Sequence, residues 1–279
     1  MPRMTDFNFH ERRLARSLVV LRQEAGLNQL EAARAVNMKN QKLSRIEKGQ
    51  APSYHELCAL LDVYGLVFDQ WQPYKDRLEE AKSPGWWRAY GLAKQNFVSL
   101  EDEASLECEY QLGYVPGLFQ IEPYIRAILG ASRVTKSARR TDLDVEIRLR
   151  RQRRLFGPNP LRLHAIVEAS ALTSRMPDAD VAIAQLRHIV EMSVRPNITF
   201  QVLPGNIGPH DGQNGTFIVL RFPDPADPDV LYIEHSGGSM HVEAASQVKA
   251  SRLSFEHLAT LALEPDESRN WVEKVISGL

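Results

Sequence analysis

Long hydrogen-bonding side chains crowd one short stretch of this sequence, between residues 39 and 45. Amide side chains can form paired hydrogen bonds to adenine, and Arg can form them to guanine. Lys and Ser side chains can hold phosphate oxygens. These residue types at this density predict contact with the bases and the backbone of duplex DNA. The stretch contains Lys39, Asn40, Gln41, Lys42, Ser44 and Arg45.

Two short helices joined by a tight corner would position these side chains. Asn28 followed by Glu31 is an N-x-x-E capping box, so a helix is predicted to begin here and to run to about residue 36. The corner at 37–38 contains an asparagine, which tolerates a left-handed backbone better than most residues. A second helix is predicted over about 40–48, where the glycine that follows ends it.

The second of these helices has an inward and an outward side. On a period of 3.6 residues, Leu43 and Ile46 face inward, which leaves the long polar side chains pointing out. Residues 34–48 are basic, with Glu47 as the one acidic residue, as attraction to phosphate requires. A helix, a corner and a second helix of this size have the geometry of a helix-turn-helix, whose second helix lies in the major groove of DNA. The basic residues are Arg34, Lys39, Lys42, Arg45 and Lys48.

Composition limits the alternatives. The 279 residues can form two domains, and 43% hydrophobic with 25% charged residues is ordinary globular composition, which argues against disorder or a fibre. A formal net charge of −1 argues against a protein that coats nucleic acid or membrane along its whole surface. The chain has only Cys58 and Cys108, no apolar run of transmembrane length and no apolar signal-peptide core. The protein is therefore expected in the cytoplasm, associated with the nucleoid when it binds DNA.

Three segments follow from the pattern along the chain. Residues 8–82 are predicted to form an all-α domain of about five helices, the last over about 68–82, because capping boxes and helical apolar spacings recur there. Residues 83–98 are predicted to be a linker, since Pro and Gly interrupt the pattern. Residues 99–279 are predicted to form a larger α+β domain with a small antiparallel sheet.

Within the larger domain, helical patterns precede a group of strand-like runs. Short β-branched and aromatic runs, separated by segments rich in Gly, Pro and Asp, predict antiparallel strands at 198–203, 216–222 and 230–235. Helices are predicted over about 99–112, 121–130, 136–155, 179–193, 242–263 and 265–276.

The run from 26-GLNQ-29 through 43-LSRIEKG-49 to 64-YGL-66 resembles the Cro/C1-type, or Xre-like, helix-turn-helix domain over about residues 14–70. The resemblance implies an all-helical DNA-binding unit whose second helix of the motif reads the operator. The sequence departs from the family at two positions. The corner has Asn37 where glycine is usual, and Lys39 stands where a Ser or Thr cap is more common.

That resemblance, together with the pattern of side chains, assigns roles to particular residues. Asn40 and Gln41 are implied to read bases, with Arg45 one turn further on. A family glutamine that holds a phosphate corresponds to Gln29. The residues expected to contact the DNA backbone or to orient other side chains are Arg22, Gln29, Lys39, Lys42, Ser44, Glu47 and Lys48, with Arg22 paired to Glu47.

The rest of the chain resembles the C-terminal domain that accompanies such a DNA-binding unit in many actinobacterial regulators, including Streptomyces-type regulators of development or antibiotic production. The likeness rests on motifs that run in order from 106-LECEYQLGYVPGLFQ-120 through 148-RLRRQRRL-155 to 267-ESRNW-271. Such regulators often occur beside genes for short acidic proteins. The resemblance therefore implies a docking or sensing module.

An arginine-rich segment at 146–155 allows two interpretations. It could form a second nucleic-acid surface or hold an anionic ligand. Alternatively, its arginines pair with the acidic stretch 101–109 of the same domain, and the outer ones are solvated, as charge runs usually are. The pairing is the expected arrangement. The arginines are Arg148, Arg150, Arg151, Arg153 and Arg154.

Other residues raise the question of a metal, hydrolase or ligand site. The His and acidic residues near the predicted turns are His210, Asp211, Glu234, His235, His241 and Glu243. No H-E-x-x-H motif or nucleophile elbow accompanies them, so no metal, no cofactor and no enzymatic activity are expected. The aromatic residues at 86–90 fit a ligand pocket, a subunit contact or packing of the linker. The run 112–124 fits core packing better than the edge of a cavity.

Together these patterns predict a sequence-specific DNA-binding transcriptional regulator. One short helix reads only a few base pairs, so a homodimer on a two-fold DNA site is expected. The C-terminal domain is expected to mediate dimerisation, partner docking or effector sensing. The alternative is an antitoxin-like or scaffold protein whose DNA binding is autoregulatory. A stable complex with a small acidic protein encoded nearby is required by that alternative and optional for a regulator.

Overall fold

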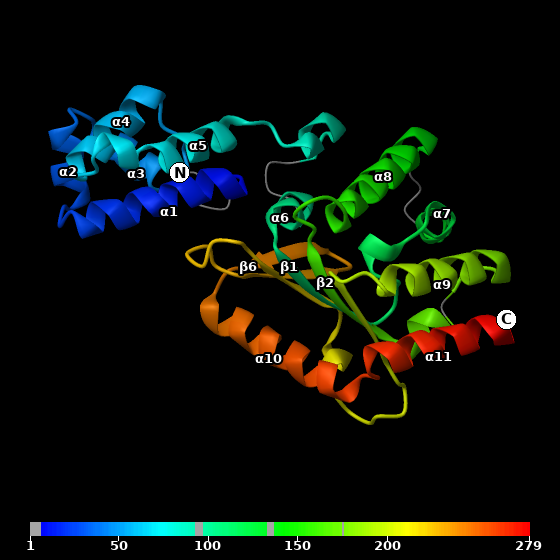
Figure 1. Cartoon of the computed structure of the whole chain (residues 1–279). Helices are drawn as coiled ribbons and strands as arrows, with labels where there is room; N and C mark the ends of the chain where they lie inside the picture. The colour runs from blue at the N-terminus through cyan, green and yellow to red at the C-terminus, as the bar shows by residue number, and fades with distance from the viewer. Residues whose placement is uncertain (1–6, 93–96, 133–136, 175) are drawn as a thin grey trace. The chain divides into compact units, whose positions relative to one another are not determined.

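The computed structural model describes residues 7–92, 97–132, 137–174 and 176–279. The chain divides into two compact units, Met1–Leu100 and Glu101–Leu279. Figure 1 shows helices in the first unit and a sheet flanked by helices in the second. Each unit has a hydrophobic core of its own.

The N-terminal unit is helical, as the sequence predicts. Three of its helices begin with a capping box, in which a polar cap and a carboxylate three residues later satisfy backbone N–H groups that the helix leaves unpaired. The predicted helix over 68–82 is divided, because Pro73 lies in the first turn of the last helix. The α-helices are α1 (Phe9–Glu24), α2 (Gln29–Ala35), α3 (Asn40–Ile46), α4 (Tyr54–Val63) and α5 (Gln72–Lys82), with the short 3-10 helices η2 (Phe68–Gln70) and η3 (Trp86–Tyr90).

Apolar side chains from all five α-helices meet in one core. Helix α1 packs along α5, so the first and last α-helices of the unit are in contact. The central side chains are completely or almost completely buried, which is the main source of stability for helices this short. They include Leu14, Leu18, Ala32, Ala33, Leu43, Ile46, Leu57, Leu60, Leu61 and Leu78.

A mixed sheet forms the centre of the C-terminal unit, with the strand order β3-β2-β1-β4-β5-β6. Strands β1, β2 and β3 are parallel to one another, whereas β4, β5 and β6 are added as antiparallel neighbours. The strands are β1 (Leu106–Gln111), β2 (Arg162–Glu168), β3 (Ile198–Leu203), β4 (Phe217–Arg221), β5 (Val230–His235) and β6 (Gly238–Val242).

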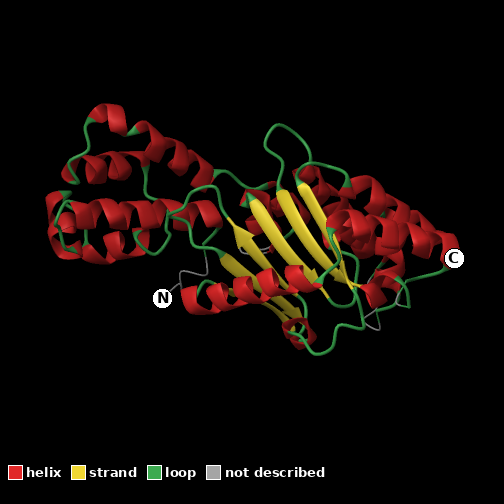
Figure 2. Cartoon of the chain, turned by 60° about the horizontal axis from the view of Figure 1, so that its bottom comes forward, coloured by secondary structure: helices red, strands yellow, loops and turns green. Residues whose placement is uncertain are grey.

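Helices provide the crossovers between the parallel strands and cover the sheet. Helix α10 packs on one face, and in Figure 2 it lies across the near side of the strands. Helix α11 packs against α9 and β3. Helix α6 (Phe97–Glu103) precedes β1. Helices α7 (Glu122–Gly130) and α8 (Ala138–Arg151) lie between β1 and β2, and α9 (Ala179–Ser193) lies between β2 and β3. Helices α10 (Ala245–Leu261) and α11 (Pro265–Gly278) follow β6. Short 3-10 helices are η4 (Gly117–Phe119), η5 (Gln152–Leu155), η6 (Ala169–Leu172) and η7 (Asp211–Asn214).

The expected small antiparallel sheet is wrong, because the sheet has six strands and its β1–β3 half is parallel. The sequence predicts a helix over 99–112, but only α6 is helical there and β1 follows it. Glu107 and Glu109 lie on one face of β1, and Tyr110 packs against α10 on the other. These two buried acidic residues give their face of β1 a polar sequence pattern. The sequence therefore does not reveal that β1 is a strand covered on both faces.

Strands β2 and β6 are also absent from the prediction. Strand β2 carries Arg162, His164 and Glu168 among its apolar residues. Strand β6 follows a two-residue turn at Ser236 and Gly237. The composition of this segment is typical of a turn between strands, so no strand was predicted there. The other predicted helices and strands are present, and their ends differ from the predicted ones by a few residues, as is usual for element ends.

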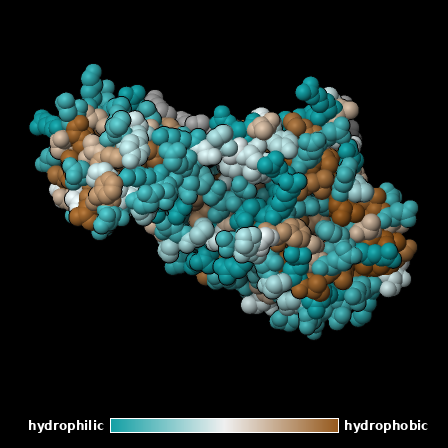
Figure 3. Space-filling model, turned by 45° about the horizontal axis from the view of Figure 1, so that its top comes forward, coloured by the Kyte–Doolittle hydropathy of each residue, from teal (hydrophilic) through white to brown (hydrophobic). Residues whose placement is uncertain are grey.

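Among the residues that the structure describes, no helix combines the length and the apolar character needed to cross a membrane. Most of the face that Figure 3 shows is hydrophilic, and hydrophobic residues form separate patches on it.

Candidate nucleic-acid interface

Helix α3 has a packed side and an exposed side. Leu43 and Ile46 are 0% and 1% exposed and lie in the core of the N-terminal unit. Asn40, Gln41 and Arg45 are exposed. Their amide and guanidinium groups can reach the edges of base pairs together if α3 enters a major groove, because they extend from the same side of one helix.

Four cationic side chains on α2, on α3 and beside α3 are exposed: Arg34, Lys39, Arg45 and Lys48. Within the described part of the chain none of these four forms an ion pair, so their charge is available to phosphate oxygens.

The corner between α2 and α3 depends on Asn37, which has a left-handed backbone with φ of 51°. Asparagine adopts this conformation more readily than other residues with a side chain, so the departure from glycine is accommodated. Lys39 is the N-cap of α3, but its side chain makes no capping hydrogen bond with a described residue. Its exposed amine remains on the surface beside the first turn of α3.

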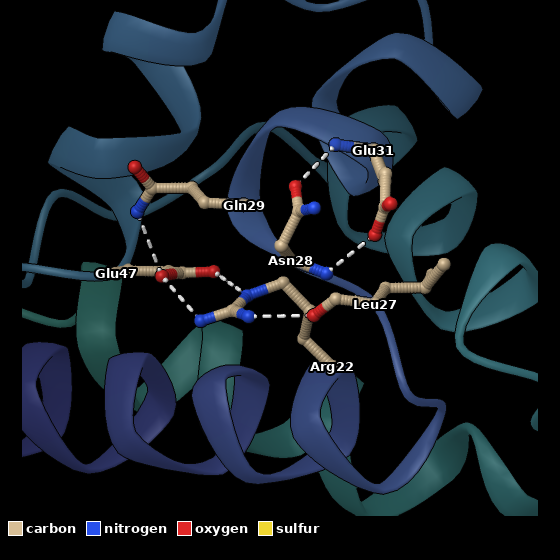
Figure 4. A network of polar contacts seen from close by, with 6 residues as sticks. All are labelled: Arg22, Leu27, Asn28, Gln29, Glu31 and Glu47. Carbon is tan, nitrogen blue, oxygen red and sulfur yellow. Dashed lines mark hydrogen bonds and ion pairs between the residues drawn. The ribbon is translucent and has the colours of Figure 1, made fainter.

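A polar cluster ties α1 to both helices of the motif (Figure 4). Arg22 of α1 donates from Nε to Oε1 of Glu47 at 2.6 Å and from Nη2 to Oε2 at 3.2 Å. Arg22 Nη1 donates to the carbonyl oxygen of Leu27 at 2.7 Å, and Gln29 Nε2 donates to Glu47 Oε2 at 2.9 Å. The Arg22 and Glu47 side chains are 12% and 7% exposed, so water screens the pair only weakly.

This cluster fixes α2 and α3 relative to each other, because Gln29 begins α2 and Glu47 directly follows α3. The hydrogen bond to Glu47 raises the pKa of Arg22 and keeps the guanidinium charged. The side-chain nitrogen of Gln29, which the resemblance assigns to a phosphate, already donates to Glu47. A phosphate contact would use the other amide hydrogen of Gln29 or replace this bond.

Lys42 forms an ion pair with Glu56 of α4. The second oxygen of Glu56 accepts the backbone N–H of Ser53 at 2.9 Å and completes the capping box. Burial would raise the pKa of Glu56, but hydrogen bonds from Lys42 and Ser53 outweigh burial and lower it. Lys42 therefore joins α3 to the start of α4, and phosphate binding by its amine would compete with that ion pair.

The sequence predicts Glu56 as the acidic member of a capping box, but not as the partner of Lys42. Tyr64 was expected only as part of an apolar face. Tyr64 is 5% exposed, and its hydroxyl has no hydrogen-bond partner among the described residues. Burial raises the pKa of Tyr64 to about 12, and the nearby charge of Glu47 adds to the shift. Tyr64 is the C-cap of α4 and continues the apolar spacing of that helix, which concealed its position beside the Arg22–Glu47 pair.

The arginine-rich segment of the C-terminal unit points largely inward, and it makes the expected pairing with residues 101–109. Arg151 donates from Nε to Glu101 Oε2 at 2.7 Å and from Nη2 to Oε1 at 2.6 Å. Arg148 Nη1 donates to Gln120 Oε1 at 2.6 Å, and Arg154 Nη2 donates to the carbonyl oxygen of Ala104 at 2.9 Å. These bonds tie α8 and η5 to α6, to Ala104 after it and to Gln120 after η4, so the three arginines stabilise the fold.

Two more carboxyl groups are buried beneath α8. Glu107 and Glu109 of β1 are 1% and 2% exposed. Burial, together with the neighbouring charges of Glu101 and Glu109, raises the pKa of Glu107 well above its usual value. Burial also raises the pKa of Glu109 to about 7. Near neutral pH this cluster therefore retains protons that exposed glutamates would have lost.

The histidines and acidic residues of the predicted turns do not form a metal centre in the described part of the chain, where no group of three or more His, Cys, Asp or Glu could hold a metal ion. His210 Nε2 lies 3.3 Å from Glu168 Oε1, which also accepts the Tyr110 hydroxyl at 2.7 Å. His257 Nδ1 lies 4.0 Å from Asp211 Oδ2. Tyr110 and Glu168 are 58 positions apart in the chain, and no local pattern predicted their contact.

The remaining aromatic candidates are packed. Trp86 contacts Trp87 and Tyr90 through edge-on rings, with centroids 6.2 and 5.7 Å apart, and Trp87 is 5% exposed. In the run 112–124 the apolar side chains Val115, Leu118, Phe119 and Tyr124 are buried, which confirms the expected core role.

The helices, the left-handed corner and the exposed polar side of α3 define a helix-turn-helix protein. A family model described as a helix-turn-helix domain matches residues 13–70, in agreement with this geometry. A second model, described as a domain of unknown function (DUF5753), matches residues 94–274. That match spans well over half of the chain, so the chain belongs to the DUF5753 family and carries an N-terminal helix-turn-helix domain. Neither the curated proteins nor the solved structures contain a match to it.

Proposed function

We propose that this protein is a sequence-specific DNA-binding transcriptional regulator of the Cro/C1 type. Helix α3 enters the major groove, where Asn40, Gln41 and Arg45 contact base edges. Lys39 and Lys48 bind phosphates on either side, with Arg34 adding positive charge nearby. The protein acts in the cytoplasm, where its DNA target lies.

The observation that carries the proposal is that α3 has one side buried in the core and one exposed polar side. Leu43 and Ile46 hold the helix in the core, and the Arg22–Glu47–Gln29 cluster fixes its end, so the exposed polar side is presented by a rigid support. Side chains positioned in advance lose less freedom on binding. The match of residues 13–70 to a helix-turn-helix family model supports the same function.

Two copies acting together complete the proposal. Helix α3 has seven residues and reads only a few base pairs, so a homodimer on a two-fold site gives the affinity and specificity that one copy lacks. The C-terminal unit supplies the contact between copies. Docking of a small acidic protein or binding of an effector to that unit would adjust DNA binding.

Affinity selection of sheared genomic DNA by the full-length protein tests the proposal. A Gln41→Ala/Arg45→Ala double variant is compared with wild type and with a matched Glu79→Ala/Lys82→Ala variant. Glu79 and Lys82 form a surface ion pair on α5, with side chains that are 73% and 43% exposed. The expected result is a shared two-fold sequence motif that wild type and the control retain and the α3 variant loses.

A wild-type protein that retains no motif at low salt would overturn base reading by α3. Equal retention of the motif by all three proteins would overturn the roles of Gln41 and Arg45. Thermal unfolding of each protein, measured in parallel, separates lost contacts from lost structure, because both α3 residues are exposed.

A further inference from the structure

The two edges of the sheet in the C-terminal unit are treated differently. At the β3 edge, the backbone N–H of Val202 donates to Ser268 Oγ of α11 at 2.9 Å, and the Val202 carbonyl accepts from the Leu263 N–H at 2.9 Å. Five of the six β3 residues are buried. This edge is therefore covered, and the outward backbone groups of Val202 have partners within the same chain.

The opposite edge is β6. It pairs with β5 on one side, where Met240 lies opposite Ile233 and Ser239 lies opposite Glu234. Beyond it the sheet has no further strand in the described part of the chain (Figure 1). Residues 238–241 are exposed, and the Met240 side chain is 48% exposed. Strand β6 thus presents an edge to which another strand can be added.

The composition of β6 lacks most of the usual protection of a free edge. Natural edge strands carry Lys, Pro or an inward charge that prevents pairing with another chain. The strand Gly-Ser-Met-His-Val contains none of these. Met240 lies on the same face of the sheet as Ile233, which packs near the core beneath α10. Pairing of this edge would cover an exposed apolar side chain without placing a charge in the ladder.

We propose that β6 pairs antiparallel with β6 of a second copy, so that the two sheets become continuous across a two-fold axis. This inference rests on the proposed function, which requires two copies. The register that pairs all five residues is centred on Met240, which then faces Met240 of the partner subunit. Gly238 lies opposite Val242 and Ser239 opposite His241, so no like charges meet.

A second copy fits this edge for a further reason. Pairing of a strand with itself about a two-fold axis is isologous, so it closes at the dimer and leaves no edge for a third copy. The same two-fold axis can relate the two half-sites of an operator. A strand from an unrelated protein would need no such symmetry. Mixing Met240→Lys with Met240→Glu distinguishes pairing with a second copy from pairing with an unrelated strand.

The test measures the mass of the full-length chain by analytical ultracentrifugation across the micromolar range, without DNA. Wild type is expected at twice the 31.6 kDa of one chain. Met240→Lys and Met240→Glu are each expected to sediment as monomers, because two like charges face each other at the centre of the interface. An equimolar mixture of the two variants is expected to restore the dimer mass. Leu253→Lys, at a 53% exposed position on α10, is the matched control and should remain dimeric.

A wild-type monomer at every concentration would overturn the inference, as would dimers of both Met240 variants. Two monomeric variants that do not restore the dimer when mixed would overturn the register centred on Met240. These outcomes are separate from those of the DNA selection. A monomer that still retains the operator motif leaves base reading by α3 intact. A wild-type dimer that the single Met240 variants lose and their mixture restores, but that retains no motif, supports β6 pairing and overturns the proposed function.

Discussion

Arg22 and Glu47 are separated by 25 positions in the chain, yet the guanidinium of one makes two hydrogen bonds to the carboxylate of the other. The pair joins the last turn of α1 to the end of α3 in a mostly buried setting. Because the two charges are paired and hydrogen-bonded to each other, they fix one geometry. An unpaired charge at the same place would cost folding free energy. The Arg22–Glu47 pair, which is not part of the exposed side of α3, therefore helps to set the orientation of that side.

Glu47→Ala should destabilise the N-terminal unit by about 3–5 kcal/mol, because it leaves Arg22 and the Gln29 amide without their buried partner. Hydrogen exchange of the full-length chain, measured by mass spectrometry, provides the check. Peptides from residues 9–82 should exchange faster, and peptides from the sheet should not change. Glu79→Ala, at a surface position on α5, is the matched control. Unchanged protection in 9–82 would show that the pair contributes little.

Arg45→Ala and Lys48→Ala should weaken DNA binding in different ways. Loss of Arg45 should cost about 1–3 kcal/mol on the selected motif and relax the preference at one base pair. Loss of Lys48 should weaken binding to all sequences alike and reduce the salt slope by about 1. Titrations of motif and scrambled duplexes at several salt concentrations distinguish these results. Equal losses on both duplexes for Arg45→Ala would assign that residue to the backbone.

The buried carboxyls beneath α8 should make the C-terminal unit less stable as the pH rises. Glutamate in an unfolded chain has a pKa of about 4.3. Folding raises the pKa of Glu107 well above this value and that of Glu109 to about 7, so the folded state binds more protons over this range. The contribution of these groups to stability is complete below about pH 4.3 and decreases towards pH 7 and above.

Glu107→Gln and Glu109→Gln test this dependence, since an amide resembles a protonated carboxyl in shape. Each variant should raise the melting temperature at pH 8 relative to wild type and should have a smaller effect at pH 5. Glu146→Gln, at an exposed position on α8, should change neither value. Equal effects of the buried substitutions at both pH values would contradict the assignment of retained protons.

Gly212→Ala should destabilise the C-terminal unit by about 1–3 kcal/mol, the usual range for overpacking. A Cβ atom at this position would lie 2.4 Å from the Tyr110 hydroxyl oxygen. Tyr110 is fully buried and is held by its hydrogen bond to Glu168, so it has little room to move. Gly205→Ala, with no atom within 4 Å of the added carbon, should be neutral or slightly stabilising. Chemical denaturation of both variants provides the comparison.

The sequence predicted the N-terminal unit well because its signals are local. The capping boxes at Asn28 and Ser53 and the spacing of Leu43 and Ile46 each span a few residues. The parallel strands could not be predicted in the same way. Strand β1 buries Glu107 and Glu109, and their setting beneath α8 depends on Arg151, more than forty residues further along the chain.

The site was likewise only partly visible in the sequence. The exposed positions of Asn40, Gln41 and Arg45 followed from helical spacing. The position of Lys42 did not, because its ion pair with Glu56 depends on how α4 returns towards α3. A lysine in a basic stretch gives no indication of which carboxylate the fold brings within its reach.

The separation of buried and exposed residues on α3 makes this helix suitable for re-engineering. Leu43 and Ile46 anchor it, while the side chains at 40, 41 and 45 extend into solvent. If α3 reads bases as proposed, a library randomised at those three positions should keep the scaffold folded and yield variants that select new operators. The protein could then serve as an interchangeable reading module for synthetic promoters, with its affinity set by the number of copies on the DNA.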